Sequence, residues 1–117
     1  MSKRETVLLL QDMIESIEKI ERYIGNDTVD EFINDELKID AVVRNLEIIG
    51  EAAARVTEEF KQEHQTIEWK KITGVGNRII HAYFGVDLQI IWSIIKNDLP
   101  VLHQQLINIV NSYKSTT

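Results

Sequence analysis

The strongest constraint on the fold of this chain is the spacing of its aliphatic residues near the N-terminus. Apolar side chains recur there at intervals of three and four residues: Leu10, Met13, Ile14, Ile17, Ile20 and Ile24. That spacing places them on one face of an α-helix. Gly25 follows directly, and glycine readily adopts the backbone conformation that ends a helix. The sequence therefore predicts an amphipathic first helix that ends at residues 25–26.

Similar patterns predict helices over the next part of the chain. Thr28 and Glu31 have the spacing of a capping box, which indicates a short second helix that bends near residues 34–35. A longer helix is expected from about residue 38 to residue 60. Its buried face comprises Val42, Val43, Leu46, Ile49, Ala53 and Val56. Gly50 in its middle predicts close approach of another helix.

The second half of the chain is also predicted to be helical. After a polar connector at residues 61–66, Trp69 begins a fourth helical segment that stops near Gly85. Asp87 is expected to cap a fifth helix, and Pro100 suits the first turn of a sixth. The apolar side of the fifth helix is Leu88, Ile91, Trp92 and Ile95. Strand-like alternation, linkers and repeats are absent from the sequence, so we expect one all-α domain over residues 1–117, a bundle of five or six helices.

Composition narrows the possible functions. The chain has no cysteine, which excludes disulfides and thiolate metal sites. Its longest early apolar run, residues 7–10, is too short for a signal peptide core or a membrane span, so we expect a cytoplasmic protein with no membrane contact. The net charge of −6 means that any nucleic-acid contact must use a local basic patch.

The stretch GVGNRIIHAYFGVD at residues 74–87 contains the strongest candidates for chemistry. Asn77 and His81 are four residues apart, so on a helix the amide is able to orient the imidazole. Histidine moves protons near neutral pH, and Arg78 supplies a permanent charge suited to phosphate. Phosphodiester chemistry on RNA fits these residues. The structural alternative is that His81 is a partly buried helix residue, the aromatic residues after it belong to the core, and Arg78 is solvated.

Three sequence blocks resemble the HepT-like family, a group of HEPN-domain toxins encoded beside minimal nucleotidyltransferase (MNT-type) antitoxins. They are AVVRNLEIIGEAAARV at 41–56, IEWKKITGVGNRIIHAYFGVD at 67–87 and IIWSIIKNDLPVLHQQL at 90–106. The resemblance implies a HEPN-type helical bundle that forms a homodimer and cleaves RNA without a metal or other cofactor. It also implies an active site at the dimer interface, built from an Arg-x4-His motif of each subunit.

The chain departs from this family pattern at one catalytic position. Members typically read Arg-Asn-x-x-x-His, whereas here Gly76 occupies the arginine position before Asn77 and His81. Losing a guanidinium that stabilises phosphate charge commonly costs orders of magnitude in rate. We therefore expect a weak or inactive nuclease, unless Arg78, three residues before His81, takes over the role. By the same resemblance, Tyr83 is the residue to which the nucleotidyltransferase partner adds AMP, silencing the toxin.

Other polar residues give weaker signals. Glu51 lies in a family block and is able to orient a motif residue, although a surface carboxylate is the simpler interpretation. Four basic residues are candidates for an RNA-binding patch: Arg44, Arg55, Lys70 and Lys71. The alternative is that they are ordinary solvated side chains on amphipathic helices. His64 and His103 lack ligand-like neighbours in the sequence, so no metal site is expected.

Two functional classes remain open from the sequence. The first is the toxin of a type VII toxin-antitoxin pair, an RNA endonuclease by resemblance that AMP transfer to Tyr83 inhibits. The second is a non-catalytic helical module that dimerises and binds a nucleotidyltransferase partner. Gly76 leaves both classes possible, because it stands where the family has its catalytic arginine. An activity assay with arginine restored at position 76 would separate the two classes.

Overall fold

The computed structural model describes residues 1–74 and 88–115. Helix α1 spans Lys3–Ile24, and its start is fixed by Ser2, whose hydroxyl accepts a 3.1 Å hydrogen bond from the amide of Glu5. It ends at Gly25, whose φ of +52° is a conformation that only glycine adopts without strain. The predicted apolar face is confirmed: its members are buried, except Ile14, which is partly exposed.

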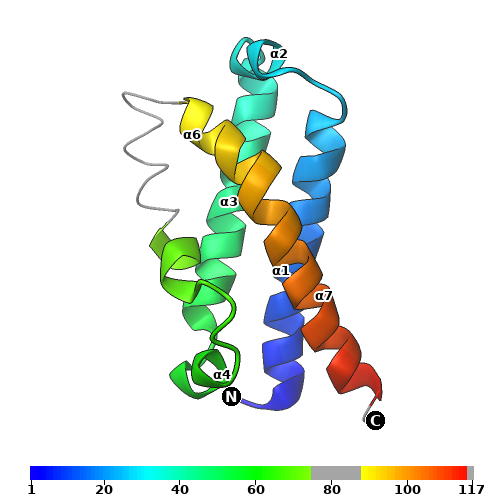
Figure 1. Cartoon of the computed structure of the whole chain (residues 1–117), viewed down its shortest axis with the longest axis vertical. Coiled ribbons are helices and arrows are strands. Elements are labelled where there is room, and N and C mark those ends of the chain that lie inside the picture. Colours follow the sequence, from blue (N-terminus) through cyan, green and yellow to red (C-terminus); the bar gives the residue numbers. More distant parts are fainter. Residues whose placement is uncertain (75–87, 116–117) are drawn as a thin grey trace.

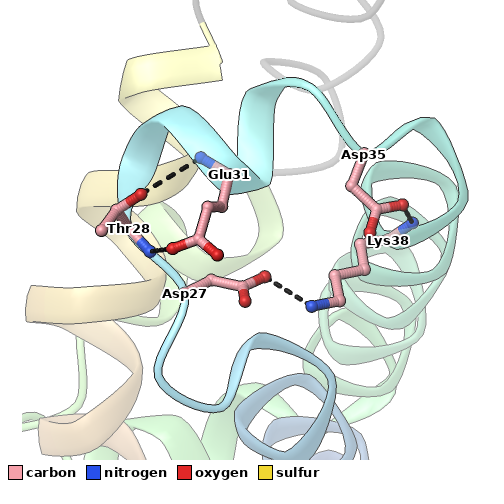
Figure 2. A network of polar contacts seen from close by, with 5 residues as sticks. All are labelled: Asp27, Thr28, Glu31, Asp35 and Lys38. Atoms are coloured by element: carbon pink, nitrogen blue, oxygen red, sulfur yellow. Dashed lines mark hydrogen bonds and ion pairs between the residues drawn. The ribbon is translucent and has the colours of Figure 1, made fainter.

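Two capping interactions fix the helix starts between α1 and the next long helix (Figure 2). The capping box of Thr28 and Glu31 is confirmed at the start of α2, Val29–Ile33, with both reciprocal hydrogen bonds present. Asp35 then accepts a 3.1 Å hydrogen bond from the amide of Lys38 and caps the following helix, α3. The predicted bend near residues 34–35 is thus a break between two separately capped helices.

Helix α3 spans Glu36–Arg55, so the prediction of one helix to residue 60 was wrong at its C-terminal end. Val56 is extended, and Thr57 caps a separate helix, α4, Glu58–Glu63, by accepting a 3.3 Å hydrogen bond from the amide of Phe60. Half of the predicted polar connector is therefore helical. All six residues predicted to form the buried face are buried, although Val56 lies just past the end of α3.

The C-terminal part of the chain forms one long rod without an intervening loop. Helix α6, Leu88–Ser93, continues into the π-helix η1, Ile94–Asp98, and then into α7, Leu99–Ser115. The amide of Leu99 bonds to the carbonyl of Ile94, five residues back. Pro100 accounts for the wider turn, because its ring lacks an N–H and would clash with the carbonyl four residues earlier. Pro100 lies in the first turn of α7 as predicted, although no break separates it from α6.

The three long helices run side by side, with α1 packed against both α3 and α7 (Figure 1). The start of α1 and the end of α7 lie toward the same end of the molecule. Helix α2 closes the opposite end, where Phe32 is fully buried and its ring centroid lies 5.5 Å from that of Trp92. Every element of the described ranges is helical, so the all-α prediction is confirmed. None of these helices is long and apolar enough to cross a bilayer.

Candidate functional site

The predicted motif lies outside the described residues. Gly76, Asn77, Arg78, His81 and Tyr83 all fall within residues 75–87, as do the predicted cap Asp87 and the predicted helix end at Gly85. The structure describes what precedes and follows the motif: a helical stem at residues 69–74 and helix α6.

The stem is fixed to the bundle by an aromatic cluster. Trp69 is buried, and its indole Nε1 donates a 3.0 Å hydrogen bond to the carbonyl of His64. Phe60 of α4 lies edge-on to the Trp69 ring at 6.2 Å and close to the His64 ring at 4.4 Å. Tyr113 of α7 approaches Phe60 at 6.1 Å, and burial, reinforced by the carboxylate of Glu63, raises the pKa of its phenol. The chain therefore enters the motif from a well-anchored segment.

A pocket of about 200 Å³ lies beside this stem, between α3, η1 and α7. Its floor is aliphatic and comes from all of these elements: Leu46, Ile49, Ile72, Ile94 and Leu102. Its rim is polar and includes Asn97, Asp98 and Gln105. The pocket is therefore apolar inside and able to form hydrogen bonds at its mouth.

Polar contacts across the rim connect the stem to the C-terminal rod. The ammonium of Lys71 lies 3.7 Å from the carboxylate of Glu68 and 3.5 Å from that of Asp98 in η1. The side-chain amide of Gln105 donates a 3.0 Å hydrogen bond to the carbonyl of Thr66. The sequence alone does not reveal this pocket, because its lining residues lie up to 59 positions apart in the chain, from Leu46 to Gln105.

The structure separates the four basic residues that the sequence offered as an RNA patch. Lys70 and Lys71 share a groove with Lys61, which sequence analysis did not select. Arg44 does not line that groove; it forms ion pairs with Glu47 at 3.6 Å and Glu51 at 3.9 Å. Arg55 is exposed and also lies outside the groove. Lysines near the stem, rather than the arginines of α3, therefore form the local basic surface.

Glu51 and the two described histidines have structural partners. The contact described for Glu51 is the ion pair with Arg44, so its suggested role in orienting the motif stays a prediction. His64 packs on the Phe60 ring, and Nε2 of His103 lies 3.0 Å from the carboxylate of Glu18 on α1. Within residues 1–74 and 88–115, histidines and carboxylates do not gather into a group of three or more that is able to hold a metal ion.

Comparison with known proteins supplies the family. The family model described as "Ribonuclease HepT-like" matches residues 13–109, which includes the stem, the motif positions and most of the rod. A protein of Thermococcus cleftensis named "Probable ribonuclease HepT" is 39% identical over 100 residues, covering 86% of this chain and 91% of that protein. No solved structure matches the chain.

Two proteins of Methanocaldococcus jannaschii extend the comparison. One, whose name assigns it provisionally to the RNases, is 36% identical over 106 residues, covering 91% of this chain and 97% of its own length. The other is named as a gamma-glutamylcyclotransferase with a provisional RNase part. It is 36% identical over 108 residues. The match covers 92% of this chain but only about half, 49%, of that longer protein. Because the family model matches residues 13–109 and two relatives at least 36% identical are covered over 91% or more of their own lengths, the chain belongs to the ribonuclease HepT-like family.

Proposed function

We propose that this chain is the RNA-cleaving toxin of a toxin-antitoxin pair, and that its reaction centre is the 76–81 motif. The observation that supports the proposal most strongly is the family match over residues 13–109, which contains His81 together with Asn77. Relatives named as RNases share more than a third of their residues with this chain over nearly their whole lengths. The proposed partners are an RNA substrate, a second copy of the chain and a nucleotidyltransferase.

The proposed reaction is internal transesterification of RNA. The ribose 2′ oxygen attacks the adjacent phosphorus and gives up its proton, while the bond to the 5′ oxygen of the next nucleotide breaks and that oxygen takes up a proton. The products are a 2′,3′-cyclic phosphate and a 5′ hydroxyl. His81 is suited to the proton transfer because imidazole exchanges protons near neutral pH. Asn77, four residues earlier, is suited to hold the ring in one orientation.

Gly76 removes the group expected to stabilise the phosphate during this reaction. A guanidinium donates paired hydrogen bonds to phosphate oxygens and keeps its charge, and glycine offers neither. We expect Gly76→Arg to raise RNA cleavage by about two to three orders of magnitude, the usual effect of one such stabilising group. Cleavage of a labelled single-stranded RNA in the presence of a metal chelator, with detection of the cyclic phosphate, measures it.

Two further variants separate chemistry from stability. Gly76→Lys adds a charge and a similar gain in helix propensity, but it lacks the planar fork, so it should restore much less activity. Adding His81→Ala to Gly76→Arg should abolish cleavage without lowering the unfolding temperature. Rapid cleavage by the unaltered chain that persists in Arg78→Ala would contradict this account of the site.

A non-catalytic helical module is the second candidate, and Gly76 is the observation that favours it. In that case the chain dimerises and binds the nucleotidyltransferase but does not cleave RNA. The Gly76→Arg variant distinguishes the two functions: formation of the protein complex without any cleavage would support the module and exclude the nuclease.

A further inference from the structure

A second hollow adjoins the pocket described above, and the two meet at the stem that leads to the motif. This hollow is a groove of about 720 Å³ along α4 and the stem. Glu68 and Lys71 line both hollows, so the pocket and the groove are adjacent. Thr73 also lines the groove, and only two residues of sequence separate it from position 76. Both hollows are thus next to the proposed reaction centre along the chain.

The groove has a small excess of positive charge. Three lysines line it, Lys61, Lys70 and Lys71, against the carboxylates of Glu58 and Glu68. Lys61 is paired with Glu58 at 3.9 Å and Lys71 with Glu68 at 3.7 Å, so the excess lies at Lys70. Lys70 is exposed and forms no ion pair with any residue of the described ranges. A locally positive groove in a chain of net charge −6 is the kind of basic patch that nucleic-acid binding by an acidic protein needs.

The pocket has the size and chemistry that one unstacked base requires. At about 200 Å³ it is smaller than the roughly 300–1,000 Å³ pockets that hold drug-sized ligands, so it suits a single ring system. Its aliphatic floor accepts the flat face of a base, and its rim offers the side-chain amides of Asn97 and Gln105. Each amide donates one hydrogen bond within the protein, to Ser93 and Thr66 respectively, and has an oxygen acceptor and a second N–H for a base edge. Proteins that read single-stranded RNA form hydrogen bonds to the edges of unstacked bases, and the polar rim supplies groups for such bonds.

We propose that the two hollows form one binding site for single-stranded RNA, in which the pocket holds an unstacked base and the lysine groove holds the flanking phosphates. The inference rests on the proposed ribonuclease function and names how its substrate is held. Because a duplex keeps its bases stacked, the site selects single strands. Lys71 is paired with the carboxylates of Glu68 and Asp98 and lies between the two hollows. In the proposed complex the base enters the pocket on one side of Lys71 and the phosphates follow the groove on the other.

Binding of a short fluorescent single strand with 2′-O-methyl riboses tests this site, because that RNA cannot undergo the cleavage reaction. In anisotropy titrations, Lys70→Ala should weaken binding about threefold and reduce the slope of log affinity against log salt by about 0.7, the value for one lost phosphate contact on a single strand. Lys19→Ala is the matched control, since Lys19 lies on α1 outside both hollows and pairs with Glu15 at 3.6 Å. It should bind the RNA as the unaltered chain does.

Two variants test the pocket separately. Val101 lines the pocket and is 59% exposed, so Val101→Phe narrows the entrance without disturbing the core and should weaken binding about tenfold, the loss expected for one excluded base. Leu37→Phe is its control, because Leu37 is 81% exposed and lies elsewhere, at the start of α3. Asn97→Ala leaves the aliphatic floor intact and should change which base is preferred. A duplex of the same sequence should bind at least tenfold more weakly than the single strand.

The possible failures are distinguishable. If Gly76→Arg cleaves RNA but Lys70→Ala, Val101→Phe and Asn97→Ala all bind the single strand like the unaltered chain, the binding site is wrong and the ribonuclease function stands. If the unaltered chain does not bind RNA and Gly76→Arg does not cleave it, both proposals fail. A change in the mass of the particle on Val101→Phe, measured by light scattering, would place the pocket between copies of the chain and overturn the assignment to RNA.

Discussion

Lys38 joins the start of α3 to the turn that follows α1 (Figure 2). Its ammonium forms an ion pair with the carboxylate of Asp27, and this hydrogen bond raises the pKa of Lys38 above its ordinary value of 10.5. Because the folded-state pKa is the higher one, the contribution to stability is fully present below pH 10.5 and is lost as the pH rises through the folded value. Burial raises the pKa of Tyr113 as well, so the folded state resists ionisation of this phenol while the unfolded state ionises. Both groups therefore lower the stability of the fold as the pH rises into the alkaline range.

We expect Lys38→Met to lower the free energy of unfolding at pH 8 and to make little difference at a pH above the raised pKa of Lys38. The variant keeps the alkyl stem but loses the charge that Asp27 binds. Urea unfolding followed by circular dichroism measures this, in a Tyr113→Phe background that removes the second alkaline group. An equal loss at both pH values would show that the ammonium charge is not the cause.

Tyr83 is the residue at which we expect modification. AMP transfer to its phenol would add bulk and negative charge two residues from His81 in the sequence, at the site proposed for an RNA phosphate. Incubation with ATP and the cognate nucleotidyltransferase should raise the mass of the chain by one or more AMP units. Tyr83→Phe should remain unmodified, and Tyr23→Phe, on the exposed end of α1, is the control. Equal labelling of Tyr83→Phe would disprove the assignment.

At the scale of the element, local signals predicted helix ends well where a capping residue was recognised. Gly25 and the Thr28–Glu31 box lie where the sequence indicates. The break after Arg55 was missed because Thr57, which caps the start of α4, lies within an otherwise continuous apolar pattern. The contacts of the site were missed for a different reason. Pairs such as Lys71 with Asp98 join residues far apart in the chain, and periodicity within one helix carries no information about them.

Two glycines should respond to substitution with opposite signs. Gly25 ends α1 with φ +52° and ψ −121°, a conformation that strains any L-residue with a side chain, so Gly25→Ala should destabilise the fold by about 1–2 kcal/mol. Gly74 is helical, and no atom of the described residues lies within 4 Å of a methyl group placed on it, so Gly74→Ala should be neutral or stabilise by up to about 1 kcal/mol. Thermal unfolding of both variants checks this, and a loss in both would mean that backbone conformation does not control the result.

At the scale of the whole molecule, we expect two copies of the chain to associate. Large apolar side chains outside the proposed RNA site remain exposed on the described surface, among them Leu8 and Ile90. The family resemblance implies a two-fold homodimer with Asn77, His81 and Tyr83 near its axis. Light scattering at micromolar concentration should give twice the chain mass of 13.6 kDa. A monomer mass would contradict the dimer and any active site composed of two subunits.

The sequence was sufficient for the all-α architecture because the apolar periodicity is strong in each long helix. The role of the motif stays a prediction from the sequence, because residues 75–87 lie outside the described residues. The sequence could not predict the pocket or the groove, whose walls depend on how α3, the stem and the rod pack together. Lys61 illustrates the difference: its role follows from sharing a surface with Lys70, nine residues later and on another element.

The π-helix η1 determines which side chains at the two ends of the C-terminal rod lie on the same face. Ile91 and Val110 are both buried, and the nineteen steps between them turn a plain α-helix through roughly 1,900°, about one residue more than five full turns. The wider turn of η1 absorbs that extra residue and returns both side chains to one face. A chain one residue shorter within 94–98 would therefore keep the two side chains in phase as a plain helix. Pro100 would then lie in a helix interior and kink it, so the extra residue and the proline would have to be gained or lost together during evolution.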